Sequence, residues 1–323
     1  MLEKYHDELL SCTGCGFCKK PYFTLDFCRK ESDFPKGKVM IAYGMLTGEI
    51  EEDDYVVRAL QKCTLCRRCE EDCPSLIKIA EIIQAARHDL KHMLPPHEKL
   101  LANIEQHDNI LGENNFEKDG GNTAFFMGCL TNKEMKDAVV SLFDKLGIDV
   151  TIIGGCCGHP AEKIGRTVEV KAREKLREKE IDRLIFSCPN GMCAFSAHNP
   201  VHISQFLITQ DVTFRKGNET YIYHDPAFLG RHLGIYEEPR KIIKRIGNLV
   251  EFNENRELAR WCGGEIEFVS AFPEEAEELA LHLVREAKEK NATIVTASPH
   301  CYHHLKEYGD VIDLLQLVEE HIS

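Results

Sequence analysis

The sequence lacks any long apolar run, and acidic residues outnumber basic ones. No stretch approaches the ~18 consecutive apolar residues of a membrane span, and residues 1–8 contain no apolar signal core. The 40 basic and 53 acidic residues give a net charge of −13. This argues against a protein that follows nucleic-acid phosphates or binds an anionic membrane directly. We therefore expect a cytoplasmic protein that binds no nucleic acid and has no membrane span of its own.

The motifs that would supply an organic cofactor are also missing. The sequence has no C-x-x-C-H haem attachment, no P-loop and no glycine fingerprint for a dinucleotide. We expect a chain without its own flavin or nicotinamide, so electrons have to reach it from another protein.

Cysteine, in contrast, is abundant, with 15 residues in a chain of 323. This content is below the ~8–10% of a disulfide-stapled scaffold but high for a chain of this length. In a reducing compartment, clustered cysteines indicate metal or redox chemistry rather than disulfides.

The pattern of apolar residues predicts an α+β protein of three domains. Residues 1–115 form an α-helical domain with helices at 53–61, 75–92 and 97–106, and the polar stretch 112–122 is a linker. From Thr123 onward, short apolar runs alternate with amphipathic segments, which predicts βαβ units and parallel sheets. The expected strands are 123–128, 150–154, 183–187, 220–224, 266–270 and 292–297, and the expected helices are 132–146, 164–179, 239–246 and 273–290.

The two halves of this C-terminal region resemble each other. The segment ending in Cys129 parallels the one ending in Ala227, Gly-Cys156-Cys157-Gly parallels Trp261-Cys262-Gly-Gly, and Cys188-Pro parallels Ser298-Pro. Such self-similarity predicts a duplicated α/β unit in two facing lobes, residues 123–210 and 218–323.

The N-terminal cysteines have the spacing of ferredoxin-type iron-sulfur ligands. Cys63, Cys66, Cys69 and Cys73-Pro74 follow the C-x2-C-x2-C-x3-C-P pattern, in which the fourth thiolate binds a neighbouring cluster. Cys12, Cys15 and Cys18 repeat the triple. We therefore predict two [4Fe-4S] clusters, one on Cys12, Cys15, Cys18 and Cys73, and one on Cys63, Cys66, Cys69 and Cys28. A zinc ribbon is the alternative for the pattern, and a buried free thiol is the alternative for Cys28.

A second constellation follows the strands predicted in the first lobe. Its five cysteines, Cys129, Cys156, Cys157, Cys188 and Cys193, would meet at the carboxyl edge of a parallel sheet. Five thiolates exceed the four ligands of tetrahedral zinc, which favours an unusual iron-sulfur cluster, with zinc on a subset as the alternative.

These motifs resemble those of a known group of proteins. Cys129, Cys156-Cys157-Gly158 and Cys188-Pro-Asn-Gly-Met-Cys193 are similar to the CCG cysteine-rich domain of the B and D components of heterodisulfide reductase, and the N-terminal half resembles the helical ferredoxin domain joined to it. The same layout occurs in the iron-sulfur subunits of glycolate and lactate oxidases. The resemblance implies a noncubane [4Fe-4S] cluster on the five cysteines of the first lobe.

The sequence departs from this family pattern at several places. Cys188 and Cys193 are separated by four residues where the family has two, and Ala227, Trp261 and Ser298 stand where cysteines are usual. Two thiols, Cys262 and Cys301, cannot hold a noncubane cluster, so we expect none in the second lobe. The two are a redox pair, a partial metal site or, as we expect from sequence, buried thiols.

Histidines in the second lobe leave further alternatives open. His224-Asp225-Pro226 and Gly230-Arg231-His232 resemble the strand end and the following turn of the family, which suggests that they line the cleft between lobes, although His224 fits a structural histidine equally well. His300, His303 and His304 are expected on an exposed helix face, with a zinc site as the alternative.

The functional prediction is an iron-sulfur redox subunit of a heterodisulfide-reductase-like oxidoreductase. Two ferredoxin-type clusters would exchange electrons with a cluster in the first lobe, which would reduce a disulfide substrate. The first alternative is an electron-relaying subunit of a flavin-dependent 2-hydroxyacid oxidase, and the second is a zinc-stabilised assembly platform. A flavoprotein or a membrane cytochrome is the expected partner, and through it the chain would lie at the periphery of the membrane.

Overall fold

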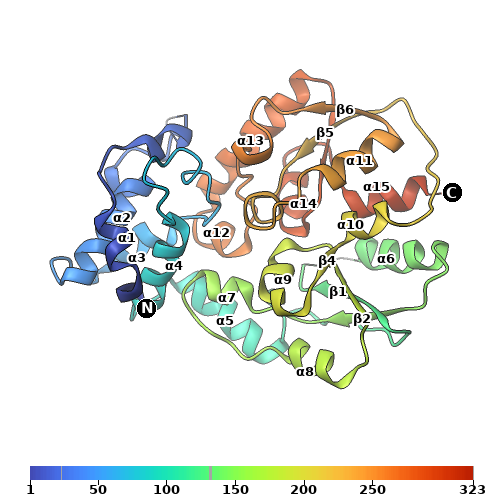
Figure 1. The fold of residues 1–323 in the computed structure, drawn as a ribbon, viewed down its shortest axis with the longest axis horizontal. Helices are drawn as coiled ribbons and strands as arrows, with labels where there is room; N and C mark the ends of the chain where they lie inside the picture. The colour runs from blue at the N-terminus through green and yellow to red at the C-terminus, as the bar shows by residue number, and fades with distance from the viewer. Residues whose placement is uncertain (23, 131–132, 323) are drawn as a thin grey trace.

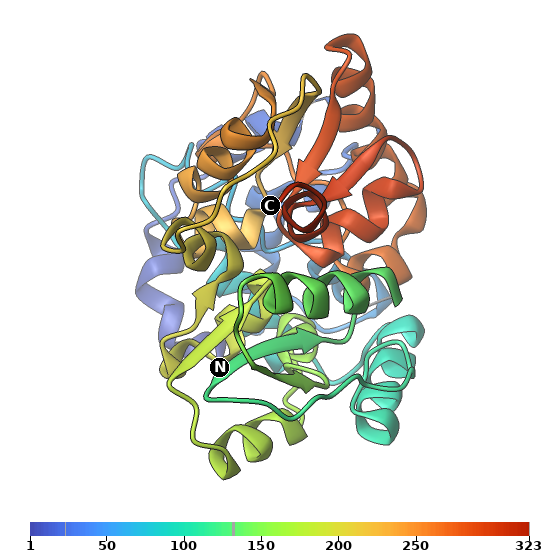
Figure 2. The same ribbon diagram turned by 90° about the vertical axis from the view of Figure 1, so that its right-hand side faces the viewer.

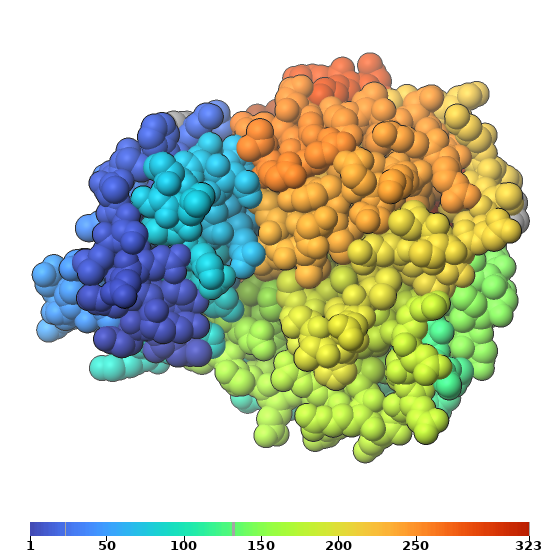
Figure 3. Space-filling model, in the orientation of Figure 1, coloured from blue at the N-terminus to red at the C-terminus, as the bar shows by residue number. Residues whose placement is uncertain are grey.

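The computed structural model describes residues 1–22, 24–130 and 133–322 and shows a helical N-terminal domain beside two α/β lobes (Figure 1). The space-filling view shows the helical domain packed against both lobes (Figure 3). Its elements are η1 Leu2–Tyr5, α1 His6–Leu10, η2 Phe17–Tyr22, η3 Glu31–Asp33, α2 Pro35–Thr47, α3 Asp54–Gln61, α4 Ile79–Asp89 and α5 Pro95–His107. The fold is mixed, with an N-terminal helical region and two parallel sheets, as the sequence predicts.

Apolar faces of α2, α3 and α4 form the core of the helical domain. Val39, Val57 and Ile83 are buried there, and the Asp53 side chain caps α3 by accepting from the Val56 N–H at 2.8 Å. The sequence places the start of α4 too early, because Leu76 adopts a left-handed conformation with φ of 53° and is 82% exposed. The loop that carries Cys73 therefore extends further than the helical periodicity suggests.

The first lobe contains a four-stranded parallel sheet in the order β2-β1-β3-β4. Its elements are β1 Thr123–Gly128, α6 Lys133–Lys145, β2 Val150–Gly154, α7 His159–Lys163, α8 Lys171–Glu178, β3 Arg183–Phe186, α9 Pro189–Ala194, η4 Ser196–His198, β4 Val201–His202 and α10 Ile203–Ile208. Asn132, the first residue of one predicted helix, lies outside the described residues. The strands are buried almost throughout, as expected for a parallel sheet covered on both faces.

The second lobe contains a second four-stranded parallel sheet in the corresponding order, β6-β5-β7-β8. Its elements are β5 Thr220–His224, the π-helical turn η5 Phe228–His232, α11 Glu237–Ile246, β6 Asn248–Glu251, η6 Arg256–Leu258, α12 Ile266–Ala271, α13 Pro273–Glu289, β7 Thr293–Thr296, α14 Pro299–Lys306, β8 Val311–Asp313 and α15 Leu314–His321. The matching strand order supports a duplication, which stays a prediction.

The lobes share one hydrophobic core. Phe125 and Phe143 of the first lobe belong to the same buried cluster as Ile242 and Leu315 of the second. Figure 2 shows α6 and α15 side by side between the sheets, and their contact includes a 2.6 Å hydrogen bond from Ser141 to Glu319. The two sheets are thereby held facing each other.

Three further expectations about the predicted segments are wrong. The predicted strand 266–270 is helix α12, because Ile266 and Val269 lie on a helix that packs against α5, while the short segment β6 pairs with β5 instead. The predicted helix 164–179 begins only at Lys171, since Gly165 takes a φ of +85°. The polar stretch 112–122 is not a free linker, because Lys118 pairs with Ile152 of β2 through two backbone hydrogen bonds of 3.1 and 2.7 Å.

The second lobe depends on a buried ion pair that can be tested. The Arg240 guanidinium is fully buried and donates to Asp225 at 2.6 and 2.7 Å and to Glu251 at 2.8 Å. Arg240→Met leaves Asp225 buried without its partner, so we expect the free energy of unfolding to fall by about 3–5 kcal/mol. Anaerobic urea denaturation followed by circular dichroism measures this loss.

The matched control is Lys145→Met, which removes a half-exposed ion pair with Glu319 at 2.7 Å. That change should cost less than about 1 kcal/mol. Equal effects of the two substitutions would contradict the account of Arg240.

Candidate functional site

The first group of N-terminal cysteines surrounds one cavity. Its lining includes all four ligands predicted for the first cluster, Cys12, Cys15, Cys18 and Cys73. Gly14 and Gly16, with φ of 67° and 82°, bend the loop between the first three cysteines. Burial raises the pKa of Cys18 to about 11, and the nearby sulfurs of the other three also act to raise it. The structure brings these four thiols together, and their role as ligands stays a prediction.

The second group lies in the loop between α3 and α4. Leu65 and Arg67 adopt left-handed φ values of 54° and 60°, a strained conformation for side chains of this size that turns the loop between its cysteines. Burial, followed by the neighbouring sulfurs of Cys66 and Cys63, holds the pKa of Cys69 well above its usual value. The raised pKa favours the neutral thiol of Cys69 unless a cation takes the place of its proton.

A cavity beside this loop is bordered by both the helical domain and the second lobe. Cys63 and Cys66 line it together with Tyr22, Lys38 and Trp261. The Tyr22 hydroxyl lies 3.9 Å from Cys66 Sγ. The Trp261 Nε1 donor is buried and has no hydrogen-bond partner among the described residues. A cubane with acceptor sulfides fits this donor set, because it would satisfy both the thiolates and the indole N–H.

Cys28 lies near this loop but is less closely tied to it. Burial raises its pKa to about 11, and the ammonium of Lys38 is the next largest influence. Lys38 also interacts electrostatically with Cys63, so one buried lysine faces both thiols. Cys28 packs against the apolar cluster that contains Cys66. These contacts agree with a ligand or with a free thiol, and the Cys28 assignment remains a prediction.

Basic side chains hold the Cys63–Cys69 loop through its carbonyl oxygens. Arg87 is buried and donates to the carbonyls of Leu60, Cys63 and, at 2.6 Å, Lys163 of the first lobe. From the second lobe, Arg231 donates to the Cys66 carbonyl, and His232 contacts the Leu65 carbonyl at 2.8 Å. Both lobes therefore take part in fixing the loop, and the guanidinium groups of Arg87 and Arg231 place positive charge near it that would offset thiolates.

The five cysteines of the first lobe gather where its strands end. Cys129 directly follows β1, Cys156 and Cys157 follow β2, and Cys188 follows β3, while Cys193 lies on α9. The first four are buried. A hydrogen bond from Cys156 lowers the pKa of Cys129. The neighbouring thiols of Cys129 and Cys157 raise the pKa of Cys156. Cys188 and Cys193 both interact with Cys157.

Glycine at position 155 makes this arrangement possible. Its φ is +121°, and a Cβ there would lie 2.4 Å from the Asp108 carboxylate. The backbone before Cys156 can therefore approach residue 108, whose carbonyl accepts from the Cys156 N–H at 2.8 Å. The Gly158 N–H in turn donates to Cys156 Sγ at 3.3 Å, a bond that favours a thiolate.

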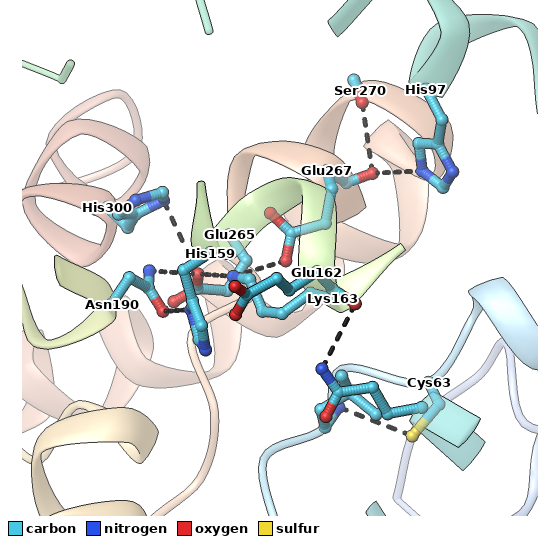
Figure 4. A network of polar contacts seen from close by, with 12 residues as sticks. Cys63, His97, His159, Glu162, Lys163, Asn190, Glu265, Glu267, Ser270 and His300 are labelled. Atoms are coloured by element: carbon cyan, nitrogen blue, oxygen red, sulfur yellow. Dashed lines mark hydrogen bonds and ion pairs between the residues drawn. The ribbon is translucent and has the colours of Figure 1, made fainter. Parts of the chain in front are cut away.

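Figure 4 shows a buried polar network around Lys163 and Glu265, both of which interact electrostatically with Cys193 of this group. Lys163 pairs with Glu265 and, at 2.6 Å, with Glu267, both from the second lobe. Asn190 donates to Glu265 at 2.7 Å and contacts His159 at 3.0 Å. Burial lowers the pKa of His159 to about 3 and raises the pKa of Glu267, so it favours the neutral form of both groups.

One apolar cluster links the cysteine sites of the helical domain to the first lobe. Buried Cys18 and Cys69 belong to it, and Cys193 of the first lobe and Phe228 of the second pack into it. Cys193 also interacts electrostatically with Arg67 of the Cys63–Cys69 loop. The departure from family spacing thus places Cys193 at the boundary between the helical domain and the first lobe.

The expectations for the histidines are partly wrong. His300 and His304 are buried rather than exposed: His304 Nε2 contacts the Ala276 carbonyl at 3.0 Å, and His300 Nδ1 lies 3.6 Å from Glu265. Only His303 is half exposed. His224 is buried, and its Nδ1 contacts the Thr296 hydroxyl at 3.3 Å. His300 and His304 of α14 are buried because they lie against Glu265 and α13 of the same lobe.

Several residues of the site carry no signal in the sequence. Lys163 and Glu265 are 102 positions apart and resemble surface residues in an amphipathic pattern. Trp261 is notable in the sequence only as a substitute for cysteine, whereas in the structure it lines the cavity of the Cys63–Cys69 loop.

Comparison with known proteins identifies both regions. Residues 8–77 match the 4Fe-4S dicluster domain, and residues 123–195 and 221–306 match the cysteine-rich CCG domain. Within the described residues, no helix is long and apolar enough to cross a membrane.

Two proteins of known name are similar to all or part of this chain. The D component of the dihydromethanophenazine:CoB–CoM heterodisulfide reductase of Methanosarcina barkeri is 26% identical, over 97% of this chain and 94% of that protein. The probable glycolate oxidase iron-sulfur subunit of Bacillus subtilis is 36% identical over 28% of this chain and 20% of its own length.

A solved structure shows the same fold. A hypothetical protein from Helicobacter pylori, 10% identical, superposes with a TM-score of 0.61 over 98% of this chain and 70% of its own. The chain belongs to the iron-sulfur proteins that carry a 4Fe-4S dicluster domain and a cysteine-rich CCG domain, and it is similar over nearly its whole length to the D component of heterodisulfide reductase.

Proposed function

We propose that this chain is the electron-transferring iron-sulfur subunit of a larger oxidoreductase. The helical domain would hold two [4Fe-4S] clusters, on Cys12, Cys15, Cys18 and Cys73 and on Cys63, Cys66, Cys69 and Cys28. The first lobe would hold a noncubane [4Fe-4S] cluster on Cys129, Cys156, Cys157, Cys188 and Cys193. When bound, these clusters supply reversible one-electron transfer.

The observation that carries this proposal is the position of the three cysteine groups around one contact region. Cys18, Cys69 and Cys193 share an apolar cluster, and Arg87 connects the Cys63 loop directly to α7 of the first lobe. Burial removes water from the region between the sites, so their environment changes little when charge moves between them. This arrangement favours a relay from the first ferredoxin-type site, through the second, to the first lobe.

The burial of the first lobe's cysteines favours relay over substrate chemistry. Cys129, Cys156, Cys157 and Cys188 are each less than 9% exposed. A disulfide substrate would have to reach one of these sulfurs. We therefore place electron relay, as in a flavin-linked 2-hydroxyacid oxidase, ahead of direct disulfide reduction.

Disulfide reduction remains the second candidate because of the buried polar network. Reducing one disulfide to two thiols consumes two electrons and two protons. Glu267 has a raised pKa and pairs with Lys163, which interacts with Cys193. This network would hold a proton close to the cysteine group of the first lobe. The partner in either case is a redox protein, such as a flavoprotein or a membrane cytochrome.

Iron content tests the number of clusters. Anaerobically purified protein should contain near twelve irons per chain, from three four-iron clusters. Cys157→Ser should lower this by about four and remove one electron paramagnetic resonance species, because only the first-lobe group includes Cys157. About eight irons with one zinc bound to the first-lobe cysteines would contradict the third cluster and support the assembly platform.

The Cys28 assignment has its own test. Cys28→Ser should remove about four irons and one ferredoxin-type signal if Cys28 completes the second cluster. Cys15→Ser is the matched control, because it should remove the other ferredoxin-type signal. Full iron content in Cys28→Ser would show that Cys28 is a buried free thiol.

The indole N–H of Trp261 offers a test through redox potential. Reduction adds negative charge to a cluster, and a donor to its sulfur stabilises that charge. Trp261→Phe should therefore make one ferredoxin-type midpoint potential more negative by roughly 20–60 mV, taking about 1 kcal/mol for the lost hydrogen bond. Redox titration monitored by electron paramagnetic resonance measures the shift.

Phe268→Leu is the control, since Phe268 packs on Trp261 at 4.8 Å between ring centroids and has no polar donor. Its midpoint potential should stay within about 10 mV of the wild-type value, a shift much smaller than the one expected from the loss of one hydrogen bond. Equal shifts in both variants would mean that packing, rather than the N–H, sets the potential.

A further inference from the structure

Three potential ligands meet in the second lobe, where the family pattern of cysteines is incomplete. One ligand atom each of His224, Cys262 and Cys301 lies within 4.8 Å of the others, and all three residues are buried. The sequence alone favours buried thiols for the two cysteines and leaves His224 as a structural histidine. Their juxtaposition adds an imidazole to the pair.

Separate elements of the lobe bring these side chains together. His224 ends β5, Cys262 lies between β6 and α12, and Cys301 lies in the first turn of α14. Gly264 permits the contact, because a Cβ there would lie 2.6 Å from the His300 carbonyl oxygen of α14. The Gly264 N–H donates to Cys262 Sγ at 3.4 Å, as expected where a backbone amide stabilises a thiolate.

The imidazole is not fully satisfied by protein groups. His224 is 1% exposed, and its Nδ1 contacts Thr296 at 3.3 Å, whereas its Nε2 has no hydrogen-bond partner within the described part of the chain. A buried polar atom left without a partner carries a desolvation penalty of about 1–3 kcal/mol. A cation that bonded to this nitrogen would supply the missing partner and remove the penalty.

Charge and size select the ligand. Two thiolates and a neutral imidazole carry a charge of about −2, which one divalent cation neutralises, so the complex can stay buried without an unpaired charge. Tetrahedral zinc with Zn–S bonds of ~2.3 Å places its sulfurs about 3.8 Å apart, which is compatible with the 4.8 Å limit observed here. Soft sulfur ligands with one imidazole favour zinc over hard cations.

We propose that His224, Cys262 and Cys301 form a mononuclear zinc site in the second lobe. The ion joins β5, the Trp261–Gly264 turn and α14, and so takes the structural place of an iron cluster for which the lobe has too few thiols. The zinc site requires neither the iron clusters nor the relay, so this proposal can be correct even if the proposed function is wrong.

The test uses the full chain, produced with Zn²⁺ in the medium and purified anaerobically. We expect about one zinc per chain by elemental analysis, in addition to iron. X-ray absorption at the zinc edge should show two sulfurs at about 2.3 Å and at least one nitrogen at about 2.0–2.1 Å. This measurement needs no substitution, so it remains decisive if the variants do not fold.

Substitutions then locate the ion. His224→Gln and the double change Cys262→Ser with Cys301→Ser should each lower zinc at least fivefold while iron stays constant. The matched control is His304→Gln, a buried histidine of the same lobe whose Nε2 contacts the Ala276 carbonyl. It should keep both metals. Cys157→Ser should lose iron and keep zinc, which separates this site from the first lobe.

Three results would overturn the proposal. One is wild-type protein with less than about a tenth of a zinc per chain. Another is zinc with an all-sulfur shell that persists in His224→Gln and in the double cysteine variant. The third is a disulfide between Cys262 and Cys301, detected under anaerobic denaturation as the loss of two hydrogens from the linked peptides.

Discussion

Sulfur atoms crowded into buried sites are the constraint on which the rest of this structure depends. Burial and neighbouring thiols hold the pKa of Cys69 and Cys188 well above the usual value, so these groups remain protonated unless a cation takes their place. Protonated thiols in contact gain little from one another, and as thiolates they repel. The close approach of sulfurs at three places is therefore costly for a protein without metal and favourable for one that binds it. This is the physical reason to interpret the fold as a scaffold for inorganic clusters.

The way the domains dock follows from the same constraint. Arg87, Arg231 and His232 reach the Cys63–Cys69 loop through its carbonyl oxygens, which leaves the sulfurs available to a cluster. The guanidinium groups also place positive charge around a site that becomes anionic when it is loaded. Because Arg87 bonds to both Cys63 and Lys163, the loop and the first lobe cannot separate without exposing a buried cation. Docking and ligand positioning are thus parts of one network.

The sequence predicts much of this molecule, and the exceptions have physical causes. Segments 123–128 and 220–224 have short apolar runs that favour buried parallel strands, and the structure has these strands with the same bounds. Segment 266–270 is a short apolar run of the same kind, but it forms helix α12, which packs against α5, a helix far away in the sequence. Spacing groups Cys12, Cys15 and Cys18 with Cys73, and the structure places them around one cavity. The sequence pattern cannot predict that Lys163 pairs with Glu265 and Glu267, because these residues meet only when the two lobes pack together.

The two lobes share a strand order but differ in what they offer a metal. The first presents five thiols at its strand ends, and Cys193 among them packs toward the helical domain. The second keeps two thiols and a histidine, while Trp261 lines the cavity of the Cys63–Cys69 loop. Trp261, which stands where the family pattern has a cysteine ligand, thereby places its indole N–H beside the cavity of the Cys63–Cys69 loop. In the relay proposed above, the second lobe would contribute without holding a cluster, because it encloses the Cys63–Cys69 loop through Arg231 and His232. Loss of a cluster in this lobe is then compatible with retained transfer, because the remaining sites converge on the first lobe.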